Sequence, residues 1–366
     1  MVEWKTIGEI STIIRGNRVT KSDLIEDGQY PVISGGVSPL GYIDKYNRES
    51  NTITIAQYGS AGYVDLQKEQ FWANDVCYSV YPQDNVLNMY LYYYLKNKQR
   101  EIYSLRTNAV PAHLPQKELA SVEIPIPSLS EQSRIVSILD TFTASIENLK
   151  EQIAERRKQY EYEREKLFSE SSSTKLIGEL TKVFSCPRVY KDQWQDSGIP
   201  FWRSSDVMSY HNKVSNPRGE VYISESLYNE LSKKTDRIEE GDILVTGGGS
   251  IGVPYLKKDN NPLFVKDADL LCIKKCKAII PSYLYHYFLS TDFKLYLNKI
   301  THDATIAHYT IGQIIDTPIP VPSLSEQSRI VSILDTFEAS IANLEAQLEL
   351  RQKQYEYYRN QLLTFE

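Results

Sequence analysis

The stretch IPIPSLSEQSRIVSILDTF occupies residues 124–142, and it returns as IPVPSLSEQSRIVSILDTF at residues 319–337. The two copies differ at one position, where Ile126 is replaced by Val321. The segments that precede the two copies differ far more from each other. The chain therefore consists of two repeats, each a variable segment followed by a nearly invariant one.

The repeat extends toward the start of each half, where short matching motifs occur at offsets that increase along the chain. The offset grows mostly between Pro200 and Gly249, so we expect an insertion of about twenty residues in the second half, covering roughly 207–240. The matching pairs are Ile7-Gly8-Glu9-Ile10 with Ile177-Gly178-Glu179-Leu180, Pro31 with Pro200, Gly59-Ser60 with Gly249-Ser250, and Ala112-His113 with Ala307-His308.

Both invariant segments predict long helices. The Ile-Pro-x-Pro motif excludes helix before Ser128 and Ser323. The Ser-x-x-Glu motifs that end at Glu131 and Glu326 predict capping boxes. Beyond them, apolar residues recur at alternating spacings of four and three, which indicates a coiled-coil seam in helices of about 60 Å. The seam runs through Ile135, Leu139, Phe142, Ile146 and Leu149 in the first copy, and through Ile330, Leu334, Phe337, Ile341 and Leu344 in the second.

Arg156 and Arg351 occupy the same seam position in the two copies. Each could be a side chain that extends along the helix edge toward solvent, or a polar seam residue that fixes the register. If the two seams pair with each other, chain order requires an antiparallel pair and a pseudo-twofold ring that brings the chain ends close together. In the alternative, each helix pairs in parallel with another chain.

The variable segments indicate a mixed α/β fold that is rich in strands. Turn residues separate short strand-like runs, and one helical run in each half precedes the Ala-His motif. The polar stretch SESSST at 169–174 is typical of a linker. We expect four segments: 1–127, 128–170, 171–322 and 323–366. The expected strands are 30–33, 52–56, 77–80, 242–246 and 269–273, and the expected helices are 87–98 and 281–298.

Composition limits the function class. The 366 residues include 41% hydrophobic and 24% charged residues, enough for each half to bury a core. No apolar run approaches the roughly 20 residues of a membrane span, and MVEWKTIGEI does not resemble a signal peptide. Four scattered cysteines fit a cytoplasmic protein without a zinc site. The net charge of −6 argues only mildly against nucleic acid, because binding needs only a local basic face.

Motifs for catalysis or cofactors are absent from the sequence. Residues 247–252 match G-x-G-x-x-G after an expected strand, but Pro254 prevents the helix that a dinucleotide site requires. Both this motif and Gly59-Ser60-Ala61-Gly62 therefore predict tight turns. No Walker A, zinc-protease or methyltransferase motif occurs. We expect a binding protein without enzymatic activity or cofactor.

Polar and basic residues cluster beside the expected turns of both halves. Arg and Lys read guanine or hold phosphates, whereas Asn and Gln read adenine. Any one of these residues could equally belong to an ordinary solvated surface. The candidate DNA-binding residues are Arg15, Asn17, Arg18, Lys21, Ser34, Gln57, Tyr58, Arg106 and Asn108 in the first half, and Arg188, Arg203, Ser204, Lys213, Arg218, Lys257, Lys258 and His302 in the second.

The doubled Ile-Pro-x-Pro-Ser-Leu-x-Glu-Gln-x-x-Ile motif, each copy followed by a heptad helix, resembles the specificity subunits of Type I restriction-modification enzymes. Trp4-Lys5 with Gly8-Glu9 and the two Gly-Ser turns share this resemblance. It implies that 1–127 and 171–322 are target recognition domains, each reading one half of a split site in double-stranded DNA. Because these domains vary freely within the family, it assigns no base-contacting residue.

The resemblance also implies that 128–170 and 323–366 are spacer helices that bind two modification (methyltransferase) subunits. Restriction (endonuclease/translocase) subunits would join them in the full complex. The candidate docking residues are Glu131, Gln132, Ile135, Leu139 and Phe142, with Glu326, Gln327, Ile330, Leu334 and Phe337 in the second copy. The alternative function is a coiled-coil adaptor that holds two protein-binding domains. DNA affinity that falls steeply with salt would distinguish the two.

Overall fold

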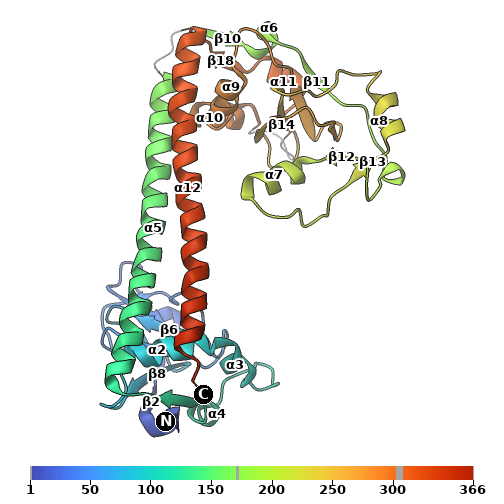
Figure 1. The fold of residues 1–366 in the computed structure, drawn as a ribbon. Coiled ribbons are helices and arrows are strands. Elements are labelled where there is room, and N and C mark those ends of the chain that lie inside the picture. Colours follow the sequence, from blue (N-terminus) through green and yellow to red (C-terminus); the bar gives the residue numbers. More distant parts are fainter. Residues whose placement is uncertain (1, 170–172, 302–307, 366) are drawn as a thin grey trace. The chain divides into compact units, whose positions relative to one another are not determined.

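A computed structural model describes residues 2–169, 173–301 and 308–365 (Figure 1). The chain divides into two compact units. Unit 1 comprises Met1–Glu151 with Glu345–Glu366, and unit 2 comprises Gln152–Leu344. Each unit contains a strand-rich head and parts of two long helices. Head 1 spans 3–126 and head 2 spans 174–320.

Head 1 is built from three small sheets and four short helices. Strands β2-β8-β5-β6 form an antiparallel sheet, β4-β3-β7 form a mixed sheet, and β1 pairs with β9. The elements are β1 (Glu3–Thr6), α1 (Ile7–Ile10), β2 (Ser11–Arg15), η1 (Lys21–Asp23), β3 (Tyr30–Ile33), β4 (Tyr42–Ile43), β5 (Thr52–Ala56), β6 (Val64–Gln67), β7 (Trp72–Ala73), β8 (Cys77–Pro82), α2 (Asn88–Asn97), α3 (Gln99–Ser104), α4 (Gln116–Ala120) and β9 (Glu123–Ile126).

Head 2 repeats this order and adds two helices, α7 and α8. Its sheets, β11-β17-β14-β15, β13-β12-β16 and β10-β18, have the strand orders of head 1. The elements are β10 (Thr174–Leu176), α6 (Ile177–Leu180), β11 (Val183–Ser185), η2 (Lys191–Gln193), β12 (Ile199–Trp202), α7 (Ser204–Asn212), β13 (Tyr222–Ile223), α8 (Glu225–Leu231), β14 (Ile243–Thr246), β15 (Pro254–Leu256), β16 (Phe264–Val265), β17 (Leu270–Ile273), α9 (Pro281–Phe288), α10 (Thr291–Thr301), α11 (Ile311–Ile315) and β18 (Pro318–Pro320).

Most expected elements are present, and the inserted segment forms α7 and α8. The helix expected at 281–298 is wrong as a single element, because it is two helices. The backbone N–H groups of Leu289 and Ser290 bond to the carbonyls of His286 and Tyr287, which closes α9. The Ser290 hydroxyl then accepts a bond from the Phe293 N–H at the start of α10. The linker is also shorter than 169–174, since Ser169 ends a helix and Thr174 begins β10.

The two glycine motifs are tight turns between antiparallel strands, as the sequence predicted. Residues 247–253 join β14 to β15, and residues 57–63 join β5 to β6. Gly249 and Gly59 have φ angles of 71° and 68°, a region that favours glycine. The strand that follows 247–252 rules out the helix that a dinucleotide site needs.

Two long helices follow the heads: α5 (Leu129–Ser169) and α12 (Leu324–Leu362). The Ser128 and Ser323 hydroxyls accept bonds from the N–H groups of Glu131 and Glu326, so half of each predicted capping box forms. The two glutamates pair instead with Arg134 and Arg329. Among the described residues, neither these helices nor any other is both long and apolar enough to cross a membrane.

The two helices pair antiparallel in each unit. In unit 1 the Phe142 ring stacks on Tyr358 at 5.3 Å, and the Arg351 guanidinium lies 5.6 Å from the centre of that same phenylalanine. In unit 2 Phe337 contacts Tyr160 at 6.2 Å, and Arg156 lies 5.7 Å from its centre. Both arginines therefore make cation–π contacts in the seam, which favours the register role over extension to solvent.

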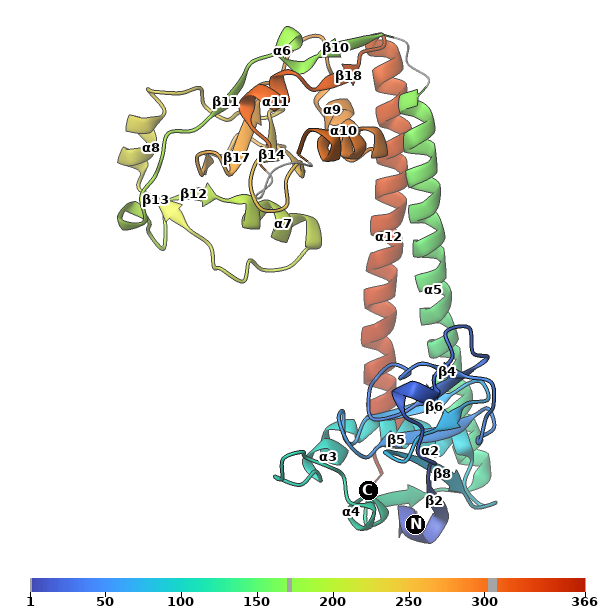
Figure 2. The ribbon, with the colours of Figure 1, turned by 180° about the vertical axis from the view of Figure 1, so that it is seen from behind.

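Each head is closed by the first turns of one long helix and the last turns of the other (Figures 1 and 2). Ile135 and Leu139 of α5 share the core of head 1 with Leu363, which follows α12. Ile330 and Leu334 of α12 share a core of head 2 with Leu167 and Phe168 of α5. The chain therefore begins and ends in unit 1, although Met1 and Glu366 themselves lie outside the described residues.

This arrangement predicts tolerance to circular permutation. We expect that joining residue 366 to residue 1 by a short Gly/Ser linker, and reopening the chain between Ser169 and Ser173, keeps the melting temperature within about 4 °C. Reopening between Glu155 and Arg156 is the matched control, and it should lower the melting temperature far more because it cuts the seam. Thermal scanning with circular dichroism checks both. An insoluble first permutant would contradict the ring.

Candidate nucleic-acid interface

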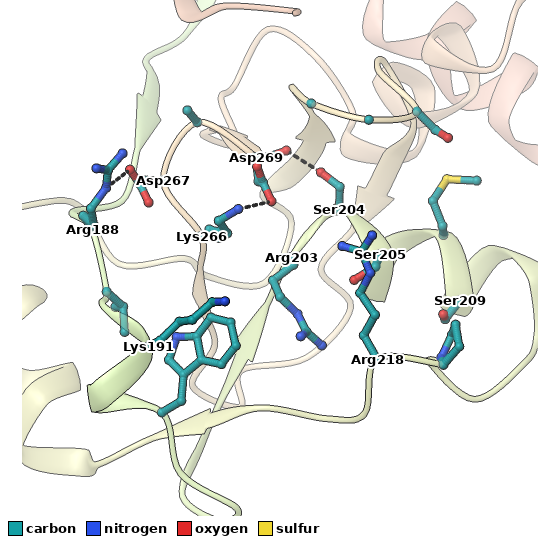
Figure 3. Close-up of a pocket in the computed structure, with 18 of the residues that line it drawn as sticks. Arg188, Lys191, Arg203, Ser204, Ser205, Ser209, Arg218, Lys266, Asp267 and Asp269 are labelled. Carbon is teal, nitrogen blue, oxygen red and sulfur yellow. Dashed lines mark hydrogen bonds and ion pairs between the residues drawn. The ribbon is translucent and has the colours of Figure 1, made fainter.

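Head 2 contains a pocket of about 1190 Å³ (Figure 3). Its walls come from three places: the segment around η2, the segment that includes α7 and the loop after it, and the turns at 248–250 and 266–269. Figure 3 shows basic side chains from all these segments, apart from the 248–250 turn, gathered around one hollow. The α7 wall belongs to the insertion that head 1 lacks.

Polar contacts fix the inserted wall. The Arg203 backbone N–H and guanidinium both bond to the Asp206 carboxylate, at 2.8 and 2.9 Å, across the first turn of α7. The same guanidinium donates to the Gly219 carbonyl at 2.6 Å. The Asn216 amide donates to the Ser205 hydroxyl at 3.2 Å. Arg203 is 7% exposed, so it holds the loop to the helix rather than facing solvent.

The basic residues of the pocket fall into two groups. Arg188 pairs with Asp267 at 2.8 Å, and Lys266 pairs with Asp269 at 2.9 Å. Arg203 is neutralised by Asp206. Lys191 and Arg218 are exposed, and neither pairs with a carboxylate in the part of the chain that the structure describes. These two cations are free to bind an anionic ligand such as a phosphate.

The remaining candidates of head 2 occupy different surroundings. The Ser204 hydroxyl donates to the Asp269 carbonyl at 2.8 Å, so it fixes the pocket wall. Lys213 ends α7 in a left-handed conformation, and Lys258 is exposed outside the pocket. Lys257 is 3% exposed and bonds to Asp259, which argues against contact with a duplex. His302 lies outside the described residues.

The candidates of head 1 gather on loops near β2, β5 and α3. Arg18, Lys21 and Asn108 are exposed, and so is Asn17. The Arg15 guanidinium donates to the Asp75 carbonyl at 3.0 Å.

The others in head 1 have partners within the head. Tyr58 stacks on His113 at 5.2 Å, and Arg106 lies over Tyr103 at 5.1 Å. The Ser34 hydroxyl accepts a bond from the Asn74 amide at 3.3 Å. Gln57 is 8% exposed, so its burial argues against direct contact with bases.

The sequence reasoning overlooked Lys191, Lys266 and Trp194, which line the pocket. Lys191 could have been found from the repeat alone. At the offset of 170 that relates the first motifs, it corresponds to Lys21, and both residues begin equivalent 3-10 turns, η1 and η2. No comparable signal marked Lys266, which follows β16 and reaches the pocket through the pairing of β16 with β12, or Trp194, which directly follows η2.

The predicted docking residues are mostly buried. Gln132, Ile135 and Leu139 are 0% exposed, as are Gln327 and Leu334, and Ile330 is 1% exposed. Phe142 and Phe337 lie in the seam, and Glu131 and Glu326 pair with arginines. For the six buried residues, burial argues against contact with a partner.

The two buried glutamines fasten each helix to its head. The Gln132 amide accepts a bond from the Leu87 N–H at 2.8 Å and donates to the Asn85 and Pro127 carbonyls at 3.0 Å. Gln327 makes the same three bonds with Ile280, Ala278 and Pro322. The repeated Glu-Gln motif is thus explained in part by attachment of the helix.

The cysteines carry no sign of a reactive site. All four are free thiols, and Cys77, Cys186 and Cys272 are buried. Burial raises the pKa of Cys77 and of Cys186 to about 12. Both thiols are therefore protonated at neutral pH, a state that disfavours metal binding and nucleophilic chemistry.

Comparison with known proteins identifies the family. The model of the Type I restriction modification DNA specificity domain matches residues 1–156 and 170–351. A putative type I restriction enzyme specificity subunit of Haemophilus influenzae is 33% identical over 385 residues, covering 100% of this chain and 96% of its own. The EcoR124I/EcoR124II specificity subunit of Escherichia coli is 28% identical, with 100% and 94% covered.

Solved structures support the same fold. The S subunit of a type I restriction-modification system from M. genitalium matches with a TM-score of 0.66 and 20% identity, covering 100% of this chain and 97% of that one. A chain from a structural study of type I complex assembly and conformational transition matches with a TM-score of 0.60 and 14% identity, covering 99% and 97%. At these identities the similarity concerns the fold alone.

Proposed function

This chain belongs to the type I restriction-modification DNA specificity family, and we propose that it reads a two-part DNA site with one head per half-site. Specificity subunits are non-catalytic components that provide DNA sequence specificity. In this proposal 1–127 and 171–322 are the reading domains, and 128–170 and 323–366 are the helices that carry them. The function is exerted in the cytoplasm, where the DNA is accessible.

One observation supports the proposal that the two heads recognise different half-sites. The heads share every sheet and its strand order, yet their loops differ, and α7 with the loop that follows it forms one wall of a basic pocket in head 2. The need to keep a stable fold explains why the two heads share their sheets, but it does not explain why their loops differ. Different half-sites would require different loops on the same scaffold.

The proposed DNA-contacting residues are the exposed, uncompensated ones. In head 2 these are Lys191 and Arg218, supported by the paired Arg188 and Lys266 at the pocket rim. In head 1 they are the exposed loop residues Arg18, Lys21 and Asn108. Cations without internal partners bind phosphates or guanine edges at the lowest cost, because no existing ion pair has to break.

We further propose that each helix docks one modification subunit through its exposed face, and that restriction subunits join the complete complex. The exposed stripe Ser130, Ser133, Ser137, Thr141 and Ala144 is identical to Ser325, Ser328, Ser332, Thr336 and Ala339. Leu129 and Leu324, 47% and 51% exposed, start both stripes with an apolar side chain. Exposed positions have no packing reason to stay identical.

Farther along, identity at exposed positions is interrupted, first at Glu147 against Ala342, although some exposed residues such as Tyr162 and Tyr357 still match. A recent duplication alone would have left the heads equally similar. Binding of the same partner at two places explains why the exposed positions in the first turns of both helices are identical without interruption.

The test of the proposed function is an exchange of heads. Replacing residues 174–318 by the second head of another family member should change one half of the modified site and leave the other half unchanged. The readout is sequencing of modified bases in DNA from cells that express the hybrid with its modification subunit. A change in both halves would contradict independent reading by the two heads. Modification that does not depend on this chain would favour the alternative function, a coiled-coil adaptor that holds two protein-binding domains.

The pocket predicts a matched set of single substitutions. We expect Lys191→Ala and Arg218→Ala each to weaken DNA binding about tenfold, and each lost phosphate contact to reduce the salt slope by about 1. Lys277→Ala is the control, because this lysine is exposed in the same head but lies outside the pocket. Fluorescence anisotropy at several salt concentrations measures both quantities. Equal effects for all three variants would indicate only nonspecific attraction.

The repeated stripe predicts the stoichiometry of the complex. Ser133→Arg or Ser328→Arg places a long charged side chain on one stripe, so each should leave one bound modification subunit, and the double variant should leave none. Ala154→Arg, at an exposed position of α5 that differs from its counterpart Glu349, should keep two bound subunits. Native mass spectrometry counts the subunits. Two bound subunits in the double variant would rule out this face.

A further inference from the structure

A buried histidine joins head 2 to both long helices in unit 2. His286 on α9 is 1% exposed. Its Nε2 lies 2.8 Å from Asp335 Oδ1 on α12, and its Nδ1 lies 3.0 Å from the Tyr160 hydroxyl on α5. The same hydroxyl donates to Glu338 Oε1 at 3.0 Å. Four side chains from three helices thus form one network.

Counting protons in this network determines the state of the histidine. A carboxylate only accepts, so Nε2 must carry a proton to bond to Asp335. Tyr160 gives its single proton to Glu338, so its oxygen must accept from Nδ1, which must also carry a proton. With both carboxylates ionised, only an imidazolium satisfies all three bonds. A neutral ring leaves Asp335, Tyr160 or Glu338 without its bond.

The surroundings of His286 agree with a positive charge. Asp335 and Glu338 bring two carboxylates, with Glu338 Oε1 3.8 Å from Nδ1. Burial, and then the charge of Glu338, raise the pKa of Tyr160, so this hydroxyl keeps the proton that it donates.

Other titratable and charged groups lie one layer farther out. Arg164 on α5 lies over the Tyr160 ring and pairs with Glu165. On the head side, Tyr285 meets His286 edge-on at 5.4 Å, and His211 stacks on Tyr285. On the helix side, Arg156 lies over Phe337. Each of the two arginines is thus placed over an aromatic ring.

Unit 1 has the corresponding junction without a histidine. Tyr93 on α2 takes the place of His286, and its hydroxyl donates to Asp140 at 2.6 Å. Thr143 replaces Glu338, and its hydroxyl lies 3.3 Å from that of Tyr93. Tyr355 takes the place of Tyr160, and its hydroxyl also bonds to Thr143. Burial raises the pKa of Tyr93, so this junction holds no group that changes charge near neutral pH.

We propose that His286, Asp335, Glu338 and Tyr160 form a proton-dependent latch, which fastens head 2 to α5 and α12 while His286 is an imidazolium. Histidine is the side chain that ordinarily changes charge between about pH 5 and 8. When the ring loses a proton, the latch loses one charge-assisted bond and head 2 is held less firmly. Head 1 keeps its attachment over the same range. This inference is independent of the proposed function.

Two measurements on the full chain test the latch. In protein labelled with ¹⁵N-histidine, nitrogen NMR should show both ring nitrogens of His286 protonated at about pH 6. The His286 signal is assigned by its loss in the His286→Tyr variant. Amide hydrogen exchange of α9, corrected for the intrinsic effect of pH, should accelerate about tenfold or more between about pH 5.5 and 8. Exchange of α2, the counterpart in unit 1, should change less than about twofold over that range, since no histidine takes part in the bonds there. A neutral His286 at the lower pH, or equal changes in both helices, would overturn the proposal.

Variants that exchange the two junctions provide matched controls. His286→Tyr with Glu338→Thr copies the junction of unit 1, so it should abolish the pH dependence of α9. Tyr93→His with Thr143→Glu should create pH dependence in α2. Persistence of the α9 effect in the first pair would refute the latch. Acceleration of α9 exchange by a chelator at low pH would also refute it, because it would assign the cluster to a metal ion instead.

Discussion

The structure depends on burying the first turns of each long helix in the core of the head that precedes it. Ile135 and Leu139 complete the core of head 1, and the buried Gln132 amide bonds to the loop before α2. Ile330, Leu334 and Gln327 do the same in head 2. A helix that is part of a core cannot turn independently of its head. The direction of each head with respect to its own helix is therefore set by packing and not by a flexible hinge.

The features that could be predicted from the sequence are those that local patterns determine. Strands 30–33 and 52–56, both glycine turns and both long helices follow from local patterns of apolar residues, glycine and proline, so they were predictable. The helix at 281–298 was not, since its apolar pattern continues across the break at Leu289–Ser290. The capping serines were predicted correctly, whereas Glu131 and Glu326 prefer arginines one turn onward.

The site was less predictable than the fold because it depends on which charges meet. Arg203 and Lys257 look like solvent-exposed cations in the sequence, but both are buried beside carboxylates. Lys191 and Arg218 are equally ordinary in the sequence, and they line the pocket without an acidic partner among the residues that the structure describes. The ion pairs of Arg203 and Lys257 are both local in sequence, and it is the folded loops that bring these charges together. The predicted docking residues were also hard to judge from the sequence. The two copies are identical at buried and exposed positions alike, so identity alone does not reveal which residues a partner can reach.

The α7–α8 insertion adds surface to head 2 without changing the strand order of its sheets. It leaves β12 and β14 in the sheet orders that β3 and β5 occupy in head 1, and part of its polar anchoring is internal, from Arg203 to Asp206 and Gly219. New loops of this kind can accumulate changes without altering the strands beneath them. If the heads read DNA as proposed, a change of target needs few compensating mutations, and the helices proposed to bind the partners stay unchanged.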